Sequence, residues 1–273
     1  MRRCLVLTAI IVVSTVSGPI AIGQRADLLG SVEHLDTVNV NASVTQYEGK
    51  SAINLTGARQ QGAPDIRGAR PPRQADARPG QRETPRAQPS GPRTTGAARA
   101  GTGDRPRRSR PESIAIVKGT DFTNGTIEVE LAGRPNKSAG PNARGFIGIA
   151  FHVEKADPIS YDCFYLRPTN GRADDQLRRT HSCQYMSHPD HPFYVLRRES
   201  PGLYESYVDL VPGQWTNVKI EVDGQKAMLY VHGSDQPCLV VNDLKRAGES
   251  GAIALWMEQS TDAYFRNLVV TDK

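Results

Sequence analysis

The chain has 273 residues, of which 38% are hydrophobic and 6% aromatic, and its formal net charge is +5. This length is compatible with one or two domains. Thirteen arginines and only five acidic residues fall within 57–112, so the part expected to fold is mildly acidic. The positive charge therefore does not indicate a nucleic-acid-binding fold.

Residues 1–23 have the pattern of a secretory signal peptide. Two arginines follow Met1, the stretch 5–16 is mostly apolar, and small residues at 21 and 23 precede Gln24. This apolar stretch is shorter than the roughly 20 residues that a membrane-spanning helix needs. We expect an exported protein, secreted or periplasmic, with no transmembrane span in the mature chain.

Alternating residues predict a β-hairpin at 37–56, with a turn at Glu48-Gly49. The pattern then stops, because 57–112 contains nine Pro, eight Gly and no aromatic residue. Such a segment cannot bury enough apolar surface to offset the entropy lost on ordering. We predict a disordered Arg/Pro/Gly-rich insertion in a loop of one domain, formed by 24–56 and 113–273, because loop closure costs little more as a loop lengthens.

The insertion has two interpretations. An Arg-rich arm would contact RNA, anionic lipid or anionic polysaccharide, whereas a solvated spacer would have no specific partner. The absence of interleaved aromatic residues favours the spacer, without a specific nucleic-acid ligand. Non-specific contact with anions through 57–112 stays open.

Short alternating segments separated by turn residues fill the rest of the chain. The expected strands begin at 114 and continue at 125–132, 144–153, 161–167, 182–187, 193–198, 203–211, 213–223, 226–232, 238–241, 251–257 and 263–271. Helical periodicity is almost absent, so we predict an all-β fold, a two-sheet antiparallel jelly-roll sandwich.

Two of these strands have informative faces. On 144–153 we expect Phe146, Gly148, Ala150 and His152 on one face, where small residues indicate that something approaches the backbone closely. On 161–167 the residues Tyr161, Cys163, Tyr165 and Arg167 share one face.

The segment 168–192 is dense in Arg, Asp, His and amide groups. Long ordered loops in compact domains are often functional. Sugars present hydroxyls and weakly apolar ring faces, so a saccharide site needs hydrogen-bonding groups beside an aromatic platform. The predicted ligand-binding residues are Tyr165, Arg167, Asn170, Arg172, Asp174, Asp175, Arg178, His181, Tyr185, His188 and Trp256, of which Tyr165, Tyr185 and Trp256 would stack on the sugar.

Catalysis stays open. Candidates for an acid or base are Glu128, Asp175 and Glu258, with His181 as a proton carrier. Glu130, Asp174 and Glu205 are further carboxylates that could belong to a hydrolytic pair. No nucleophile elbow, phosphate loop or dinucleotide motif occurs.

No metal or other cofactor is favoured. His181, Cys183, His188 and His191, with Asp190, have zinc-binding chemistry, but their spacing matches no common zinc pattern. A Ca²⁺ site through Asp174 and Asp175 is a further alternative.

Four cysteines are present, and Cys4 lies in the predicted export signal. The remaining Cys163, Cys183 and Cys238 allow one disulfide or none, because their number is odd. A Cys163–Cys183 bond is one option, which spacing alone does not establish.

Four segments carry a resemblance to a known family: 118–130, 213–222, 251–256 and 263–270. They resemble the concanavalin A-like (laminin-G-like) jelly rolls, and within these the secreted bacterial branch of the 3-keto-disaccharide hydrolase domains, long known as a domain of unknown function. The resemblance covers 37–56 and 113–273. It implies two antiparallel sheets with a concave face for sugar, and relatives that either bind or hydrolyse carbohydrates. It transfers no catalytic motif.

We therefore expect an exported protein that binds a saccharide on the concave sheet face. One alternative is a glycoside hydrolase or a 3-keto-glycoside-processing enzyme that uses the same cleft. A second alternative is a cell-envelope adhesion or scaffold protein that acts through its Arg-rich arm.

Overall fold

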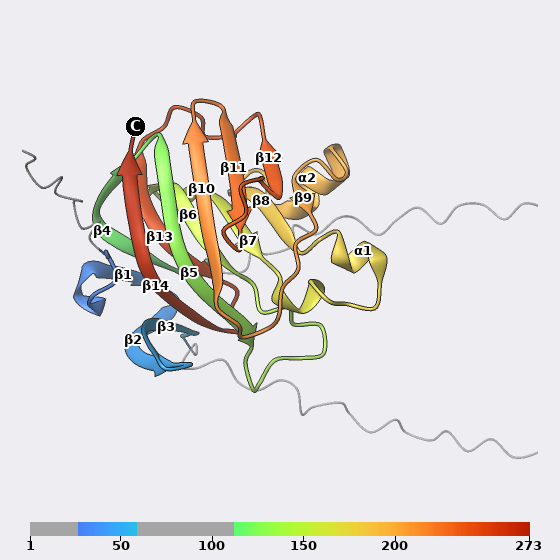
Figure 1. Cartoon of the computed structure of the whole chain (residues 1–273). Coiled ribbons are helices and arrows are strands. Elements are labelled where there is room, and N and C mark those ends of the chain that lie inside the picture. Colours follow the sequence, from blue (N-terminus) through green and yellow to red (C-terminus); the bar gives the residue numbers. More distant parts are fainter. Residues whose placement is uncertain (1–26, 59–111) are drawn as a thin grey trace, which may run out of the picture.

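The computed structural model describes residues 27–58 and 112–273 (Figure 1). The predicted signal peptide lies outside the described residues, and so does the predicted insertion except for Gly57, Ala58 and Glu112. Within the described ranges no helix has the length and apolar character needed to cross a membrane.

Two seven-stranded sheets form a sandwich in which all strand pairs are antiparallel. Sheet A contains, in spatial order, β1 (Leu35–Val38), β4 (Ile114–Phe122), β13 (Gly251–Met257), β6 (Ile147–Glu154), β7 (Ser160–Leu166), β8 (Cys183–His188) and β9 (Glu205–Ser206). Sheet B contains β12 (Leu239–Val241), β11 (Lys226–Val231), β10 (Thr216–Asp223), β5 (Gly125–Pro135), β14 (Thr261–Asp272), β3 (Lys50–Gly57) and β2 (Val40–Tyr47). This arrangement confirms the predicted two-sheet antiparallel jelly-roll sandwich.

The main core lies between the facing sides of the two sheets. On β10 the side chains of Val218, Ile220 and Val222 are buried, whereas the intervening Lys219 and Glu221 are only partly covered. This is the period-2 pattern of a strand with one buried face. Full burial of one such aliphatic side chain contributes about 1.5–3 kcal/mol, so the alternation fixes which face of β10 points inward.

The first predicted strand is divided between the sheets. Asn39 has a φ of 54°, and the chain leaves β1 in sheet A to enter β2 in sheet B at this residue. Asparagine adopts the left-handed region more readily than most residues other than glycine. Here its Nδ2 donates to the carbonyl of Glu112, 73 positions away in the sequence, at 2.8 Å. The following turn at Glu48-Gly49 is as predicted, with φ values of 48° and 73°.

Two predicted strands are wrong. The stretch at 193–198 forms helix α2 (Phe193–Glu199), whose buried residue is Leu196. Pro192 begins it, with a φ of −66° that suits a helix entry. The stretch at 203–211 is mostly irregular and contains only the short β9. Tertiary context overrides the β propensity of these aromatic and aliphatic residues.

The expected polar segment contains a 3₁₀ turn, η3 (Pro168–Asn170), and a single helical turn, α1 (Gln176–Arg179). A second 3₁₀ turn, η1 (Val32–His34), precedes β1. In Figure 1, α1 and α2 lie at the end of the sandwich where β8 and β9 form the edge of sheet A.

A bulge in β6 corrects the predicted faces of that strand. The β6–β7 register shifts between Phe151 and Glu154, and His152 has a φ of 53°. Beyond the bulge the faces exchange, so His152 turns inward while Val153 joins the outer face. The sequence alternation predicts the opposite, because one extra residue in a strand inverts every side chain after it.

The structure argues against a Cys163–Cys183 bond, which was one of the options left open by the sequence. Cys163 points to the outer face of sheet A and Cys183 to the main core, and both are free thiols. Neighbouring strands present these residues on opposite faces, so they cannot be bridged.

Candidate functional site

The outer face of sheet A, which points away from the main core, carries an apolar cluster of its own. Outer faces of antiparallel sheets are ordinarily polar. The buried members of this cluster are Ile114, Ile116, Ala150, Val153, Tyr161, Cys163, Tyr165, Met186, Ala254 and Trp256. This face is therefore the unusual surface of the sandwich.

The strand registers place one residue from each of five strands in a single line across this face. Trp256 of β13 pairs with Gly148 of β6, which pairs with Tyr165 of β7. Tyr165 pairs with Gln184 of β8, and Gln184 pairs with Glu205 of β9. We call these five residues the cross-strand row. It combines two aromatic rings with an amide and a carboxylate.

Gly148 allows the two rings of the row to meet. The ring centroids of Tyr165 and Trp256 are 5.0 Å apart, although β6 lies between their strands. A Cβ on Gly148 would lie 2.2 Å from the carbonyl oxygen of Phe164 and 2.6 Å from the Cβ of Tyr165. The predicted close approach at this glycine is thus the approach of β7 and its tyrosine.

Arg167 follows β7 and lies among three aromatic rings. Its guanidinium carbon is 5.0 Å from the ring centroid of Phe146, 5.3 Å from Tyr165 and 5.1 Å from Phe193. These distances are within the range of cation–π attraction. Arg167 is only 6% exposed, so these rings and their neighbours remove its charge from water.

The hydrogen-bond partners of Arg167 are neutral. One terminal nitrogen donates to the hydroxyl of Tyr165 at 2.7 Å and to the side-chain oxygen of Gln184. Its buried Nε–H has no hydrogen-bond partner within residues 27–58 and 112–273. Among the described residues no carboxylate lies within 4.0 Å of its guanidinium nitrogens. A buried donor without a partner costs free energy, so this group is poised for an acceptor.

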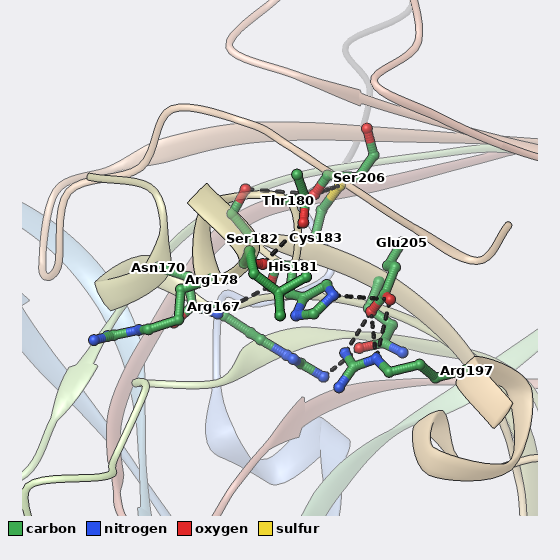
Figure 2. A network of polar contacts seen from close by, with 12 residues as sticks. Arg167, Asn170, Arg178, Thr180, His181, Ser182, Cys183, Arg197, Glu205 and Ser206 are labelled. Atoms are coloured by element: carbon green, nitrogen blue, oxygen red, sulfur yellow. Dashed lines mark hydrogen bonds and ion pairs between the residues drawn. The ribbon is translucent and has the colours of Figure 1, made fainter. Parts of the chain in front are cut away.

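Glu205, at the end of the row, is held by the side chains of an arginine and a histidine. Its oxygens accept hydrogen bonds from Arg197 Nε at 3.0 and 3.1 Å, and its Oε1 lies 3.1 Å from Nε2 of His181. Figure 2 shows this network, with the Arg167 guanidinium pointing toward the Arg197–Glu205 pair. Burial lowers the pKa of His181, against the opposing effect of the Glu205 charge. Near neutral pH the neutral imidazole therefore donates to Glu205.

A second polar group lies along the same face. Trp256 Nε1 donates to the hydroxyl of Tyr161 at 3.0 Å, and this hydroxyl donates to Glu112. The other carboxyl oxygen of Glu112 is 3.2 Å from Nδ1 of His188, whose ring stacks on Tyr161. Burial raises the pKa of Glu112 to about 7 and lowers the pKa of His188. Both groups therefore favour their neutral forms at this position.

Five of the predicted ligand-binding residues lie on or beside this face: Tyr165, Arg167, His181, His188 and Trp256. Asn170 and Arg178 support the adjoining loop instead. Asn170 Nδ2 donates to the carbonyl of His181 at 3.1 Å, and Arg178 Nε donates to Asn170 Oδ1 at 3.5 Å. These two residues thus hold His181 in place.

The predicted residues Arg172, Asp174 and Asp175 point elsewhere. Arg172 is exposed and forms a bidentate ion pair with Asp209, with both N···O distances 2.8 Å. Asp174 is exposed, and Asp175 caps α1 by accepting a hydrogen bond from the amide of Arg178 at 2.7 Å. Their charge density in the sequence reflects an ordinary solvated loop and a helix cap.

Tyr185 cannot stack on a sugar at this face, because its side chain points into the main core and is fully buried. Its hydroxyl donates to Asp162 at 2.6 Å and accepts from the amide of Lys245 at 2.9 Å. Asp162 also lies 3.2 Å from Nδ1 of His152. Burial raises the pKa of Tyr185 far above its ordinary value, and this network stabilises the interior.

The three carboxylates proposed as catalytic candidates do not converge. Glu128 lies opposite Lys219 in the β5–β10 register of sheet B, and Asp175 caps α1. Glu258 follows β13, where its Oε2 accepts a hydrogen bond from the amide of Ser260 at 3.0 Å.

The residues with zinc-binding chemistry do not converge either. Cys183 points to the core, whereas His181 and His188 pair with Glu205 and Glu112. In the part of the chain that the structure describes, no three His, Cys, Asp or Glu side chains are grouped so as to hold a metal ion.

Sequence reasoning missed Glu112, Phe146, Gln184, Phe193 and Arg197 as site residues, and it named Glu205 only as a possible hydrolytic carboxylate. Phe193 and Arg197 are four residues apart on α2, so helical spacing would have placed them on one face. Gln184 and Glu205 follow only from the strand registers. Glu112 was assigned to the insertion, because its neighbours at 57–111 are Pro-, Gly- and Arg-rich.

Neither protein-family models nor curated protein sequences match this chain. Solved structures similar to it include a carbohydrate-binding module from Bacillus subtilis, at 15% identity and a TM-score of 0.40, covering 59% of this chain and 82% of that one. A protein of unknown function with a galectin-like fold, also from Bacillus subtilis, has 11% identity and a TM-score of 0.44, covering 88% and 90%. A β-glucanase from Bacillus licheniformis has 12% identity and a TM-score of 0.35, covering 59% and 71%. At these values the likeness says nothing of ligand or activity, and the strand order and registers given above define the fold.

Proposed function

We propose that this chain binds a saccharide on the outer face of sheet A. The observation that carries the proposal is the contact between Tyr165 and Trp256 across Gly148, beside a guanidinium held among aromatic rings. Sugar rings place their apolar faces on aromatic side chains, and their hydroxyls bond to a few fixed donors and acceptors. Both requirements are met beside this buried contact, by the partly exposed rings of Phe146 and Phe193 and by the donors of Arg167 and Arg197.

Phe146 and Phe193 form the accessible edge of the proposed site. They are partly exposed, whereas Tyr165 is 1% and Trp256 7% exposed. Arg197 lies beside Phe193, with its guanidinium carbon 5.4 Å from the ring centroid. A sugar would therefore first contact the two phenylalanine rings, and its hydroxyls would accept hydrogen bonds from Arg197.

The two tryptophans of the chain provide a direct test, because Trp256 lies on sheet A and Trp215 precedes β10 of sheet B. In Trp215→Phe the fluorescence of Trp256 alone is followed during titration with a panel of oligosaccharides. In Trp256→Phe the fluorescence of Trp215 alone is followed. We expect a saturable change in the first variant and none in the second.

A saturable change only in Trp256→Phe would place the sugar at Trp215 and contradict the proposal. Isothermal titration of the unsubstituted chain with the same panel supplies the affinity that both fluorescence titrations must reproduce. Absence of binding by calorimetry across the panel would contradict saccharide binding itself.

We propose further that the protein is exported and acts in the periplasm or outside the cell. The support is the pattern at 1–23, two arginines and an apolar stretch before small residues. Expression of the full chain in a bacterial host should yield a product that begins at Gln24 in the periplasm or medium. A product that retains Met1 in the cytoplasm would contradict this expectation.

A glycoside-processing activity is the second candidate, and one observation favours it. Glu112 is a carboxyl whose pKa is raised to about 7 on the proposed binding face, as a general acid requires. Its distance from Glu205, the other carboxyl on this face, weighs against a two-carboxylate mechanism. Glu112 lies beside His188, and Glu205 lies beside Gln184. These two residues of β8 are four positions apart, or about 13 Å, which is beyond the ~6.5–9.5 Å between the carboxyls of inverting glycosidases.

A proton NMR time course distinguishes binding from catalysis. Oligosaccharides, including 3-keto disaccharides, are incubated with the full chain and with Glu112→Gln. New anomeric signals that grow with the unsubstituted protein and vanish with the variant would establish an enzyme that uses Glu112. Line broadening without new signals would establish a binding protein.

A further inference from the structure

We infer that the saccharide carries a carboxylate and that Arg167 binds this group. The inference rests on the proposed function, because it names the class of sugar for the same site. It starts from a combination that Arg167 shows among the described residues: it is 6% exposed, its buried Nε–H has no acceptor, and no carboxylate pairs with its guanidinium. Arg246 and Arg266 also have a buried Nε–H without an acceptor, but each lies beside a glutamate.

The charged residues that interact around Arg167 and His181 are mainly positive. Arg167 and Arg178 act on the guanidinium of Arg144, whose pKa is lowered first by burial and further by these two charges. Arg197 and Asp175 both act on His181, which places them in the same region. Among the described residues, these interactions bring Arg144, Arg167, Arg178 and Arg197 together with Asp175 and Glu205. This group of six has four positive and two negative charges, and an anion would neutralise part of the excess.

The chemistry of a guanidinium selects among anions. Its planar fork matches the two oxygens of a carboxylate, and charge-assisted hydrogen bonds of this kind are about twice as strong as neutral ones. The present partners of Arg167, a phenol and an amide, supply no charge. A sugar carboxylate at Nε would satisfy the orphan donor and counter the buried charge, while the sugar ring lies against Phe146 or Phe193.

The test compares oligosaccharides that differ in one functional group. Uronate-containing oligosaccharides, such as oligogalacturonates and oligomannuronates, are titrated calorimetrically against the full chain. The same oligosaccharides, after chemical reduction of each carboxylate to an alcohol, serve as the neutral probes. We expect at least one acidic form to bind ~10–100-fold more tightly than its reduced form, a difference that salt diminishes.

Arg167→Gln should reduce the affinity for the acidic sugar to that for the neutral one. The matched control is Arg172→Gln, which removes an exposed arginine already paired with Asp209 and should leave both affinities unchanged. Thermal unfolding of both variants separates loss of binding from loss of folding. If Arg167→Gln does not fold, the ratio between acidic and neutral sugars in the unsubstituted protein still decides the question.

Equal affinity for acidic and reduced sugars would overturn the inference while leaving the proposed function intact. Binding of neither sugar would overturn both. Tight binding of sulfated sugars with no binding of uronates would also overturn it, because the recognised anion would then be a sulfate ester.

A separate observation supports a second proposal: we propose that Cys183 and Cys238 form a disulfide under oxidising conditions. Their sulfur atoms are 3.9 Å apart, and Cys238 is partly exposed. Cys183 lies on β8 of sheet A, and Cys238 directly precedes β12 of sheet B. The bond would therefore link the two sheets, and it needs the sulfur atoms to approach to about 2 Å.

The reaction requires a disulfide oxidant such as oxidised glutathione. The thiolate of Cys238 attacks one sulfur of the oxidant and releases one thiol. The Cys183 thiol then displaces the second, so two protein thiols are oxidised and one small disulfide is reduced to two thiols. Cys183 lowers the pKa of Cys238 through their hydrogen bond, which suits Cys238 to the first attack.

Peptide mapping without reductant tests this proposal on the chain incubated with oxidised glutathione. We expect a linked peptide pair containing Cys183 and Cys238, present in Cys163→Ser and absent in Cys238→Ser. Reduction should lower the melting temperature by about 10 °C, since the closed loop is long. Free Cys183 and Cys238 after this incubation, or a bond to Cys163, would overturn the proposal.

Discussion

The outer faces of the two sheets both carry aromatic and charged residues, but they differ in how the positive charges are paired and solvated. On sheet B, Lys50 pairs with Glu130 at 3.0 Å and Lys219 with Glu221 at 2.7 Å, and these side chains keep contact with water. On sheet A, Arg167 is almost fully buried, and its hydrogen-bond partners among the described residues are neutral. Cations that are paired and solvated need no ligand, whereas a buried cation without a counter-ion does.

Aromatic content alone does not separate the two faces. On sheet B, Tyr47 stacks on Tyr264 with ring centroids 3.7 Å apart, and Trp215 meets Tyr47 edge to face. These three rings are partly exposed, so they could also contact a ligand with an apolar face. The comparison therefore teaches that the charge balance, rather than the number of rings, distinguishes the proposed site. The predictions that follow test that distinction.

The largest expected effect is on folding, from Gly148→Ala. The new Cβ would lie 2.2 Å from the backbone oxygen of Phe164, so β6 and β7 would have to separate. We expect a loss of about 3–4 kcal/mol in the free energy of unfolding, measured by urea denaturation. Gly140→Ala is the control, because no atom lies within 4 Å of its added Cβ. Equal stability of the two variants would show that the cross-strand row is not closely packed.

The second prediction concerns pH. The pKa of Glu112 is raised to about 7 in the folded protein, above its ordinary value of 4.5, so the folded state retains a proton that the unfolded chain releases. Its contribution to stability is complete below about pH 4.5 and is lost as the pH rises to about 7, a change of about 3 kcal/mol. Glu112→Gln should remove this component, as measured by unfolding at pH 5 and pH 8.

His188 acts in the opposite direction, because burial lowers its pKa and stability is then gained as the pH rises through its ordinary range. The difference between the unsubstituted protein and Glu112→Gln isolates the carboxyl. If this difference does not change between pH 5 and pH 8, Glu112 is not protonated in the folded state.

The third prediction compares rings on the two faces. Phe193→Ala should weaken saccharide binding about tenfold, or about 1.4 kcal/mol, because the sugar loses ring contact at the accessible edge of the site. Trp215→Ala on the other face should leave the affinity unchanged, as measured by calorimetry. Tyr194→Ala controls for damage to α2, since Tyr194 is its 50% exposed neighbour. Weaker binding in Trp215→Ala alone would assign the ligand to sheet B.

The smallest expected effect is that of Lys219→Ala. This residue forms a partly exposed ion pair with Glu221, and such pairs contribute about 0.2–1 kcal/mol. Urea denaturation should detect a loss in this range that shrinks as salt is added. A loss above about 2 kcal/mol would mean that the charges of sheet B are not simply solvated.

Period-2 alternation predicts most of the fold, because burial of one sheet face fixes the register of each strand. The central hairpin at 216–231 and β13 follow directly from their sequences. The bulge at His152 does not follow, since an extra residue leaves no mark on local alternation. Helix α2 does not follow either, because its four leading residues are apolar or aromatic and suit a strand equally well.

The candidate site is only half predictable for a similar reason. Tyr165 and Arg167 share a strand face in the sequence, so their proximity could be expected. Glu205 reaches them only through β8 and β9, a pairing that no local pattern encodes. The polar segment at 168–192 attracts attention by its charge density, yet Arg172, Asp174 and Asp175 belong to the solvated loop and the α1 cap.

The pairing of β3 with β14 has a consequence for biosynthesis. Asn54 donates a hydrogen bond to the carbonyl of Ala263, across 209 residues of sequence. During translation the hairpin of β2 and β3 leaves the ribosome long before its partner strand is made. Until then its inner edge is an unpaired template for other strands, and such distant pairings form slowly. Sheet B therefore closes only after β14 has been made, and loss of β14 would leave the facing edges of β3 and β5 unpaired.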